Sequence, residues 1–265
     1  MKRMLSAALA AAMIGASVTA HAADKVKVGF ISTLSGPNAA LGIDIRDAFQ
    51  LAVKMNGGKL GGLPAEVIVG DDQFNPDTGK QVADRMIKRD RVDFLTGIVF
   101  SNILLAVAPA AIEAKTIVIS ANAGPSQLAG EQCSKYFFSA SWQNDVNNGA
   151  PGMLATQRDF KNIFLIAPNY PAGRDALNGF KTYYKGKIVD EVYTKLGQVD
   201  YQAEISQLRA KNPKAVFVFF PGGMGIQFMR QYSQAGLRNT IPLYSVYTAD
   251  ELSLPAVKDD ALGQF

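Results

Sequence analysis

Histidine and cysteine are nearly absent from this sequence of 265 residues, which contains one of each, His21 and Cys133. A zinc or iron–sulfur site needs several such ligands, so a metal centre of that kind is excluded. A single cysteine also cannot form a disulfide within the chain. Ser-His-Asp and Cys-His catalysis need a histidine, and His21 lies in a segment that we expect to be removed from the mature protein. We therefore expect a protein that is not an enzyme and that carries no metal or other cofactor.

Neither sign of charge dominates the sequence, which has 27 Lys and Arg against 23 Asp and Glu. Proteins that bind nucleic acid concentrate basic residues on one face, and this balance does not indicate such a face. Hydrophobic residues make up 48% and charged residues 19%, a composition unlike that of disordered chains. The sequence also lacks the G-x-x-x-x-G-K-[ST] phosphate loop and the G-x-S-x-G nucleophile motif. A globular chain with a sizeable core and no nucleic-acid partner is expected.

The first 22 residues have the three parts of a secretory signal peptide. Lys2 and Arg3 give a basic start, residues 4–18 are apolar, and Ala20-His21-Ala22 has the A-x-A form. A membrane anchor is the alternative, but a span needs about 20 apolar residues and this run is shorter. No cysteine lies near the site, which argues against a lipid anchor. We predict cleavage after Ala22 and a periplasmic mature protein.

Strand-like and helix-like segments alternate through the rest of the chain, which predicts βαβ units and parallel sheets covered by helices. We expect an α/β protein with two doubly wound parallel-sheet lobes, over residues 23–159 and 160–265, and a ligand cleft between them. Because the chain ends soon after a strand, we also expect the C-terminal part of the second lobe to be missing. The predicted strands span residues 26–31, 65–69, 93–96, 116–120, 162–166, 188–193, 215–220 and 242–246. The predicted helices span residues 44–55, 103–114, 145–158, 173–184, 203–210 and 226–235, and a further helix begins with Asp77 as its N-cap.

Small polar residues follow three of the predicted strands. Leu34-Ser35-Gly36-Pro37 follows the first strand, Ser101 and Asn102 follow the third, and Asn122-Ala123-Gly124 follows the fourth. The carboxyl ends of parallel strands meet at one edge of a sheet, where ligands bind. Exposed N–H groups at a helix start attract carboxylates, and a hydroxyl and an amide beside them add directed hydrogen bonds. Helix capping is the alternative role for Ser101 and Asn102, but the three loops together predict a site for a small carboxylate-bearing ligand.

Four aromatic residues lie at or near strand ends or in loops. They are Phe100, Trp142, Tyr170 and Tyr247. Aromatic side chains at such places can sandwich a planar or apolar ligand. Core packing is the alternative for each of them singly. As a group we expect them to contact the part of the ligand that lies beyond its carboxylate.

Three further features favour structural roles over functional ones. Asp71-Asp72 could bind a metal, but no further ligand is near in sequence and we favour a solvated turn. Gly223-Met224-Gly225 precedes a predicted helix as a dinucleotide-binding loop would, but Phe228 stands where the third glycine belongs. For Cys133 we leave two possibilities open, a partner cysteine in the missing C-terminal part or a buried unpaired thiol.

Five of these segments, in this order, resemble the solute-binding proteins of ABC importers, in the branched-chain amino acid (leucine/isoleucine/valine-binding) family. The segments are Ser32 to Pro37, Gly97 to Asn102, Ile119 to Pro125, Ala167 to Tyr170, and Ile241 to Tyr247. The resemblance implies the type I periplasmic binding protein fold, a monomer, and lobes that close on a solute. It also implies delivery to a membrane permease, and through it a link to the transport ATPase. A periplasmic ligand sensor of the same fold, feeding a signalling receptor, is the alternative.

The resemblance also implies residue roles. In that family the positions of Ser101, Asn122 and Gly124 hold the carboxylate of the ligand. A threonine is usual where Gly124 stands, and a glutamate that pairs with the ligand's ammonium is usual where Tyr247 stands. An ammonium left unpaired in a closed cleft is strongly unfavourable. We therefore expect an aromatic or other organic acid in preference to a branched-chain amino acid.

Overall fold

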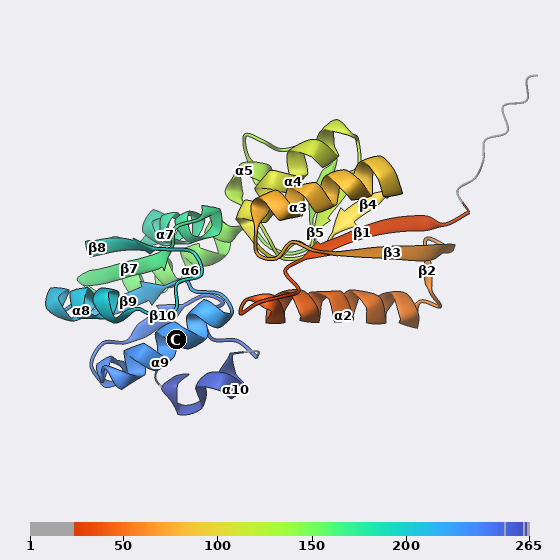
Figure 1. The fold of residues 1–265 in the computed structure, drawn as a ribbon. Helices are drawn as coiled ribbons and strands as arrows, with labels where there is room; N and C mark the ends of the chain where they lie inside the picture. The colour runs from red at the N-terminus through yellow and green to blue at the C-terminus, as the bar shows by residue number, and fades with distance from the viewer. Residues whose placement is uncertain (1–23, 252, 262, 264–265) are drawn as a thin grey trace, which may run out of the picture.

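The computed structural model describes residues 24–251, 253–261 and 263, so the predicted signal peptide and its cleavage site lie outside the described residues. The chain forms two lobes side by side, each built around its own sheet (Figure 1). Strands and helices alternate along the described residues, and every pair of neighbouring strands in the two sheets is parallel except β2 and β3. The predicted fold class, α/β with two parallel-sheet lobes, is therefore confirmed.

The N-terminal lobe contains a six-stranded sheet in the order β2-β3-β1-β4-β5-β6. Neighbouring strands are parallel except for β2 and β3, which form a short antiparallel pair. The carboxyl ends of β1, β4 and β5 therefore share one edge, as the alternation predicts. The strands are β1 (Val26–Ser32), β2 (Lys59–Leu60), β3 (Leu63–Asp71), β4 (Phe94–Thr96), β5 (Ile117–Ser120) and β6 (Phe137–Ser139).

The C-terminal lobe contains a four-stranded parallel sheet in the order β10-β9-β7-β8. Its central strands are buried on both faces, as parallel strands between two helix layers must be. The strands are β7 (Asn162–Pro168), β8 (Lys187–Thr194), β9 (Ala215–Val218) and β10 (Leu243–Ser245).

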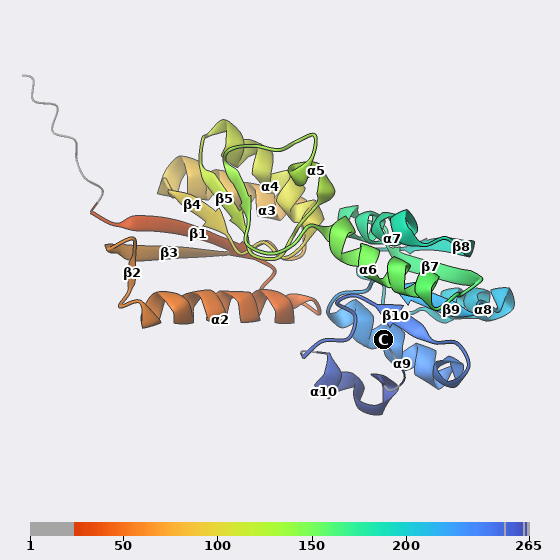
Figure 2. The ribbon, with the colours of Figure 1, turned by 180° about the vertical axis from the view of Figure 1, so that it is seen from behind.

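Helices cover both faces of the N-terminal sheet, with α2 on one face and α3 and α4 on the other (Figures 1 and 2). In the part of the chain that the structure describes, no helix is both long enough and apolar enough to cross a membrane. The helices of this lobe are α2 (Ala39–Met55), α3 (Pro76–Arg85), the π-helical turn η1 (Met86–Asp90), α4 (Ser101–Glu113) and α5 (Ser126–Ala129). Those of the other lobe are α6 (Asn144–Gln157), α7 (Pro171–Tyr183), α8 (Gln202–Lys211), α9 (Gly223–Gln234), α10 (Leu254–Val257) and the 3₁₀ turns η2 (Leu237–Asn239) and η3 (Lys258–Ala261).

Several helices begin earlier than predicted, because close contact with the preceding strand end fixes a first turn of low helix propensity. In α9 a Cβ atom on Gly225 would lie 2.3 Å from the carbonyl oxygen of Phe220, and in α2 a Cβ on Gly42 would lie 2.1 Å from that of Thr33. Only glycine allows such an approach. The predicted N-cap of α3 was also wrong. Its cap is Asn75, whose Oδ1 accepts hydrogen bonds from the amides of residues 77 and 78 at 2.8 and 3.1 Å.

Helix α6 lies with the C-terminal lobe, whereas the predicted boundary between residues 159 and 160 placed it in the first lobe. It packs along α7 so closely that a Cβ on Gly152 would lie 2.2 Å from the carbonyl oxygen of Phe180. A Cβ on Gly179 would likewise lie 2.0 Å from the carbonyl oxygen of Asp145. The chain therefore changes lobes between β6 and α6, and the sequence pattern missed this because a helix of either lobe has the same local periodicity.

Candidate functional site

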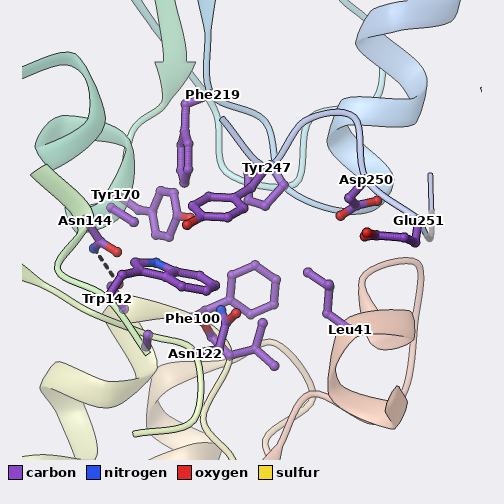
Figure 3. Close-up of a pocket in the computed structure, with 15 residues that line it drawn as sticks. Leu41, Phe100, Asn122, Trp142, Asn144, Tyr170, Phe219, Tyr247, Asp250 and Glu251 are labelled. Atoms are coloured by element: carbon purple, nitrogen blue, oxygen red, sulfur yellow. Dashed lines mark hydrogen bonds between the residues drawn. The ribbon is translucent and has the colours of Figure 1, made fainter. Parts of the chain in front are cut away.

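The facing edges of the two lobes enclose a cavity of about 290 Å³ (Figure 3). Its walls come from the segments that follow β4, β5, β6, β7, β9 and β10, and from Leu41 of α2. Cavities at the carboxyl ends of parallel strands are where α/β proteins hold ligands. The lining residues are Leu41, Val99, Phe100, Ser101, Asn122, Ala123, Trp142, Asn144, Tyr170, Ala172, Phe219, Pro221, Tyr247, Asp250 and Glu251.

Aromatic rings form much of the cavity wall. Trp142 and Tyr247 stack with their ring centroids 4.4 Å apart and their planes at 17°. Tyr170 lies between Phe100 and Phe219, 6.5 Å from each. Both lobes contribute rings, and Figure 3 shows them gathered around one space. A flat apolar ligand would find ring faces and edges on several sides, which is the contact that aromatic ligands prefer.

Tyr247, which lines the cavity, has an unusual backbone conformation. Its φ is 59°, in the left-handed region that non-glycine residues rarely adopt. The phenol oxygen accepts a hydrogen bond of 2.6 Å from Nδ2 of Asn147, on α6. Burial raises the pKa of Tyr247 above its ordinary value of 10.0. The phenol is therefore neutral at physiological pH and keeps its proton available for donation.

The N-terminus of α4 opens into the cavity and carries Ser101 as its first residue. Phe100, the N-cap, is extended (φ −101°, ψ 135°) and supplies no side-chain cap. The amides of a first helical turn have no partner within the helix, and the helix dipole adds positive potential there. This end of the cavity is thus suited to a carboxylate.

Ser101 is only 2% exposed, and its hydroxyl is held by a second helix. Oγ accepts a hydrogen bond of 3.1 Å from Nδ2 of Asn144, the first residue of α6. Asn122 lies beside it, with Nδ2 donating to the carbonyl oxygen of Val99 at 2.9 Å. A hydroxyl and an ordered amide therefore border the N-terminus of α4.

Acidic side chains line the cavity only at the end away from Asn144, where Figure 3 shows Asp250 and Glu251. Asp250 also accepts a hydrogen bond of 2.8 Å from the amide of Ser253, which orders the turn. Among the described residues that line the cavity there is no lysine or arginine. The positive potential for an anion must then come from helix amides, and the opposite end favours a donor or a cation.

Seven of the ten predicted site residues line this cavity, and three do not. Asn102 points into a separate hollow with Gln127 and Arg174. Gly124 faces the crossover between the lobes, where a Cβ would lie 2.0 Å from the carbonyl oxygen of Trp142. A threonine side chain has no room there. Ser35 lies in an exposed loop away from the cavity. Partial burial raises the pKa of the neighbouring Asp71 carboxyl, but hydrogen bonds from the Leu34 amide and the Ser35 side chain outweigh it and hold that pKa below its ordinary value.

Sequence reasoning missed several lining residues, for two different reasons. Phe219 and Pro221 follow β9, so the rule used for the first lobe would have found them. Leu41, on α2, reaches the cavity only because the start of α2 lies against Gly222 of the other lobe. No local pattern indicates that contact.

The acidic pair Asp71-Asp72 is not a solvated turn, because Asp72 is fully buried. Its Oδ1 accepts hydrogen bonds from Oγ1 of Thr33 at 2.6 Å and from the amide of Phe74 at 2.9 Å. Burial raises the pKa of the Asp72 carboxyl. The pair braces the ends of β1 and β3, and within the described residues no group of three His, Cys, Asp or Glu side chains could hold a metal. Cys133 is exposed, contrary to the possibility of a buried thiol.

Two lobes of this topology with a ligand-sized cavity at their facing strand ends define the type I periplasmic binding protein fold. The chain belongs to the periplasmic binding protein family, whose family model matches residues 25–265. Its relatives are solute-binding proteins and not enzymes, in line with the expectation drawn from the scarcity of histidine.

Among curated relatives, a Leu/Ile/Val-binding protein homolog of Brucella melitensis is 28% identical over 270 residues. The match covers 99% of this chain and 68% of the relative. The chain thus spans about two thirds of the length of the relatives that it matches. A Leu/Ile/Val-binding protein of Rhizobium johnstonii is 24% identical over 83% of this chain and 60% of the relative.

Solved structures give the same fold with different ligands. A solute-binding protein of R. palustris in complex with benzoate has a TM-score of 0.85 and 27% identity, over 89% of this chain and 66% of that one. One from Rhodopseudomonas palustris BisB5, with 3,4-dihydroxybenzoic acid, has a TM-score of 0.85 and 31% identity, over 90% and 67%. A Streptococcus pneumoniae protein in complex with isoleucine, at TM-score 0.78 and 22% identity, covers 88% and 68% and shares the fold.

Proposed function

We propose that this protein is the periplasmic solute-binding component of an ABC importer, and that its ligand is a small aromatic carboxylate. The lobes close on the ligand by a hinge motion and deliver it to a membrane permease. The observation that carries the proposal is the combination of an aromatic cavity wall with the uncapped N-terminus of α4 at one end. In this assignment Ser101, Asn122 and the first amides of α4 hold the carboxylate. Phe100, Tyr170, Tyr247 and Trp142 contact the ring.

The choice of an aromatic acid over a branched-chain amino acid rests on what surrounds position 247. The ring of Tyr247 stacks on Trp142, and its hydroxyl accepts a hydrogen bond from Asn147. The tyrosine ring therefore fills space that would be open to the ammonium group of a ligand if a glutamate stood at this position. The neighbours solved with benzoate and 3,4-dihydroxybenzoic acid support this choice. Asp250 and Glu251 would be the groups to face an ammonium if an amino acid were bound.

Trp142 provides a direct assay, because it is the only tryptophan in the chain and it lines the cavity. We expect benzoate and 4-hydroxybenzoate to change its fluorescence in a saturable way and to raise the melting temperature by mass action. Leucine and valine, tested at the same concentrations, should do neither. Saturable binding of leucine with no response to the benzoates would contradict the ligand class.

Export is the other part of the proposal. The mature protein should begin Ala23-Asp24-Lys25, following cleavage after Ala22. Intact-mass measurement of protein from the periplasmic fraction checks both the location and the site. A protein that keeps residues 1–22 in the cytoplasmic fraction would contradict it.

A further inference from the structure

A chain of buried hydrogen bonds leads from the cavity to a carboxylate outside it. Nδ2 of Asn144 donates to Oγ of Ser101 at 3.1 Å and to Oδ2 of Asp175 at 3.2 Å. Asp175 lies on α7, does not line the cavity and is 6% exposed. It receives two further hydrogen bonds from Ser126, one from the amide at 3.0 Å and one from the hydroxyl at 2.8 Å.

In this series of hydrogen bonds, each group can act as donor or acceptor in only one way. In all three of these hydrogen bonds the carboxylate oxygens of Asp175 are the acceptors. An acceptor at that place requires the Asn144 side chain to turn its NH₂ group toward Asp175. The same NH₂ group then faces Ser101.

The consequence for Ser101 follows from its single proton. Because Oγ accepts from Asn144, the hydroxyl proton is not used in that bond and is free to point into the cavity. If Asn144 were turned the other way, its carbonyl oxygen would take the Ser101 proton. The cavity would then meet a ligand with an acceptor instead of a donor.

We propose that Asp175 is a positioning residue that makes the cavity selective for anions, because it fixes Asn144 so that the Ser101 hydroxyl donates to the ligand. This inference rests on the proposed function, in which Ser101 holds a ligand carboxylate. The cavity therefore selects ligands that place a hydrogen-bond acceptor at the N-terminus of α4. A carboxylate should bind there more tightly than the corresponding neutral amide.

The arrangement also ties this selectivity to the relative position of the lobes. Asp175 belongs to the C-terminal lobe, whereas Ser126 and Ser101 belong to the N-terminal lobe. Ser126 holds Asp175 through backbone and side chain together, so the carboxylate has a fixed orientation only when α7 lies against the start of α5. Contacts from both lobes therefore determine that the Ser101 hydroxyl donates its proton toward the cavity.

The test compares benzoate with benzamide, a neutral ligand of nearly the same shape, by titration of Trp142 fluorescence in the full chain. In Asp175→Asn the new side-chain amide can donate a hydrogen bond, so the orientation of the Asn144 amide is no longer fixed. We expect benzoate affinity to fall about tenfold, the effect of 1.4 kcal/mol, while benzamide affinity changes less than about threefold. In the Ser101→Ala background the same substitution should have no further effect on the ratio.

Ser126→Ala is the second variant, because it removes one bond to Asp175 and keeps the charge and the backbone donor. It should shift the benzoate-to-benzamide ratio in the same direction by a smaller factor, and it covers the case in which Asp175→Asn does not fold. An unchanged ratio in a folded variant, or tighter benzoate binding in Asp175→Asn, overturns the positioning role. A wild-type chain that binds neither benzoate nor 4-hydroxybenzoate instead contradicts the proposed function itself.

Discussion

The hydroxyl of Ser101 shows how much one polar group in this cavity depends on its surroundings. The sequence places a serine at the start of a helix, where capping and ligand binding are both possible. In the structure the N-cap is Phe100, so Ser101 does not cap α4, and its hydroxyl is buried against Asn144. The Ser101 hydroxyl is therefore available to bind a ligand in the cavity.

Replacing Ser101 by alanine should weaken benzoate binding by about ten- to a hundredfold, because a hydrogen bond to a charged group contributes about 1.5–3 kcal/mol. The melting temperature of the ligand-free protein should change little. Trp142 fluorescence titration measures the affinity. Ser35→Ala is the matched control, since Ser35 was also a predicted site residue and lies outside the cavity; its affinity should equal that of the wild type. Equal affinity in Ser101→Ala would refute the assigned role.

The buried carboxyl of Asp72 predicts a pH dependence of stability. Burial raises its folded-state pKa above 3.8, so the folded protein retains this proton at pH values where the unfolded chain has lost it. This contribution to the free energy of unfolding is complete below pH 3.8 and is lost as the pH rises through the folded pKa. The amide in Asp72→Asn does not titrate, so the variant should not show this decrease in the free energy of unfolding.

Urea denaturation of the wild type and of Asp72→Asn from pH 3.5 to pH 7 measures the difference. The stability of the wild type relative to the variant should decrease as the pH rises above 3.8 and then level off. A relative stability that increases over this range would mean that the bonds from Thr33 and Phe74 outweigh the cost of burial.

The pair α6 and α7 carries the main lesson at the scale of elements. Gly152 on α6 and Gly179 on α7 bring the two backbones close together, and this contact assigns α6 to the C-terminal lobe. The same contact places Asn144 and Asn147 on the cavity side of α6. Periodicity predicted a helix over residues 145–158 with nearly correct ends, but it did not indicate which lobe the helix joins.

Gly152→Ala should destabilise the protein by about 1–3 kcal/mol, the usual cost of overpacking, because its Cβ would lie 2.2 Å from the Phe180 carbonyl oxygen. Chemical denaturation measures the loss. The control is Met153→Ala on the same helix, at a side chain that is 48% exposed, where a change within about 0.5 kcal/mol is expected. Equal stability of the two variants would argue against the close α6–α7 contact.

At the scale of the whole molecule, the cavity exists only because two lobes face each other. A ligand that contacts both lobes favours the closed arrangement by its differential affinity for that arrangement. Saturating benzoate should therefore reduce the radius of gyration measured by small-angle X-ray scattering. Valine at the same concentration serves as the control and should leave it unchanged. A benzoate complex with the dimensions of the free protein would contradict closure by hinge motion.

The sequence by itself determined the fold class, and it left histidine-dependent catalysis with a single candidate, His21, inside the predicted signal peptide. Strand and helix periodicity is a local property, and the scarcity of a residue type needs no structure to be recognised. It also indicated Ser101, Asn122 and four aromatic residues of the cavity, because the ends of parallel strands converge at one edge of a sheet. The tertiary structure decided the rest. It turned Asn102 and Gly124 away from the cavity and brought Asp175 within reach of Asn144, because distances between residues far apart in the chain depend on how helices and lobes pack.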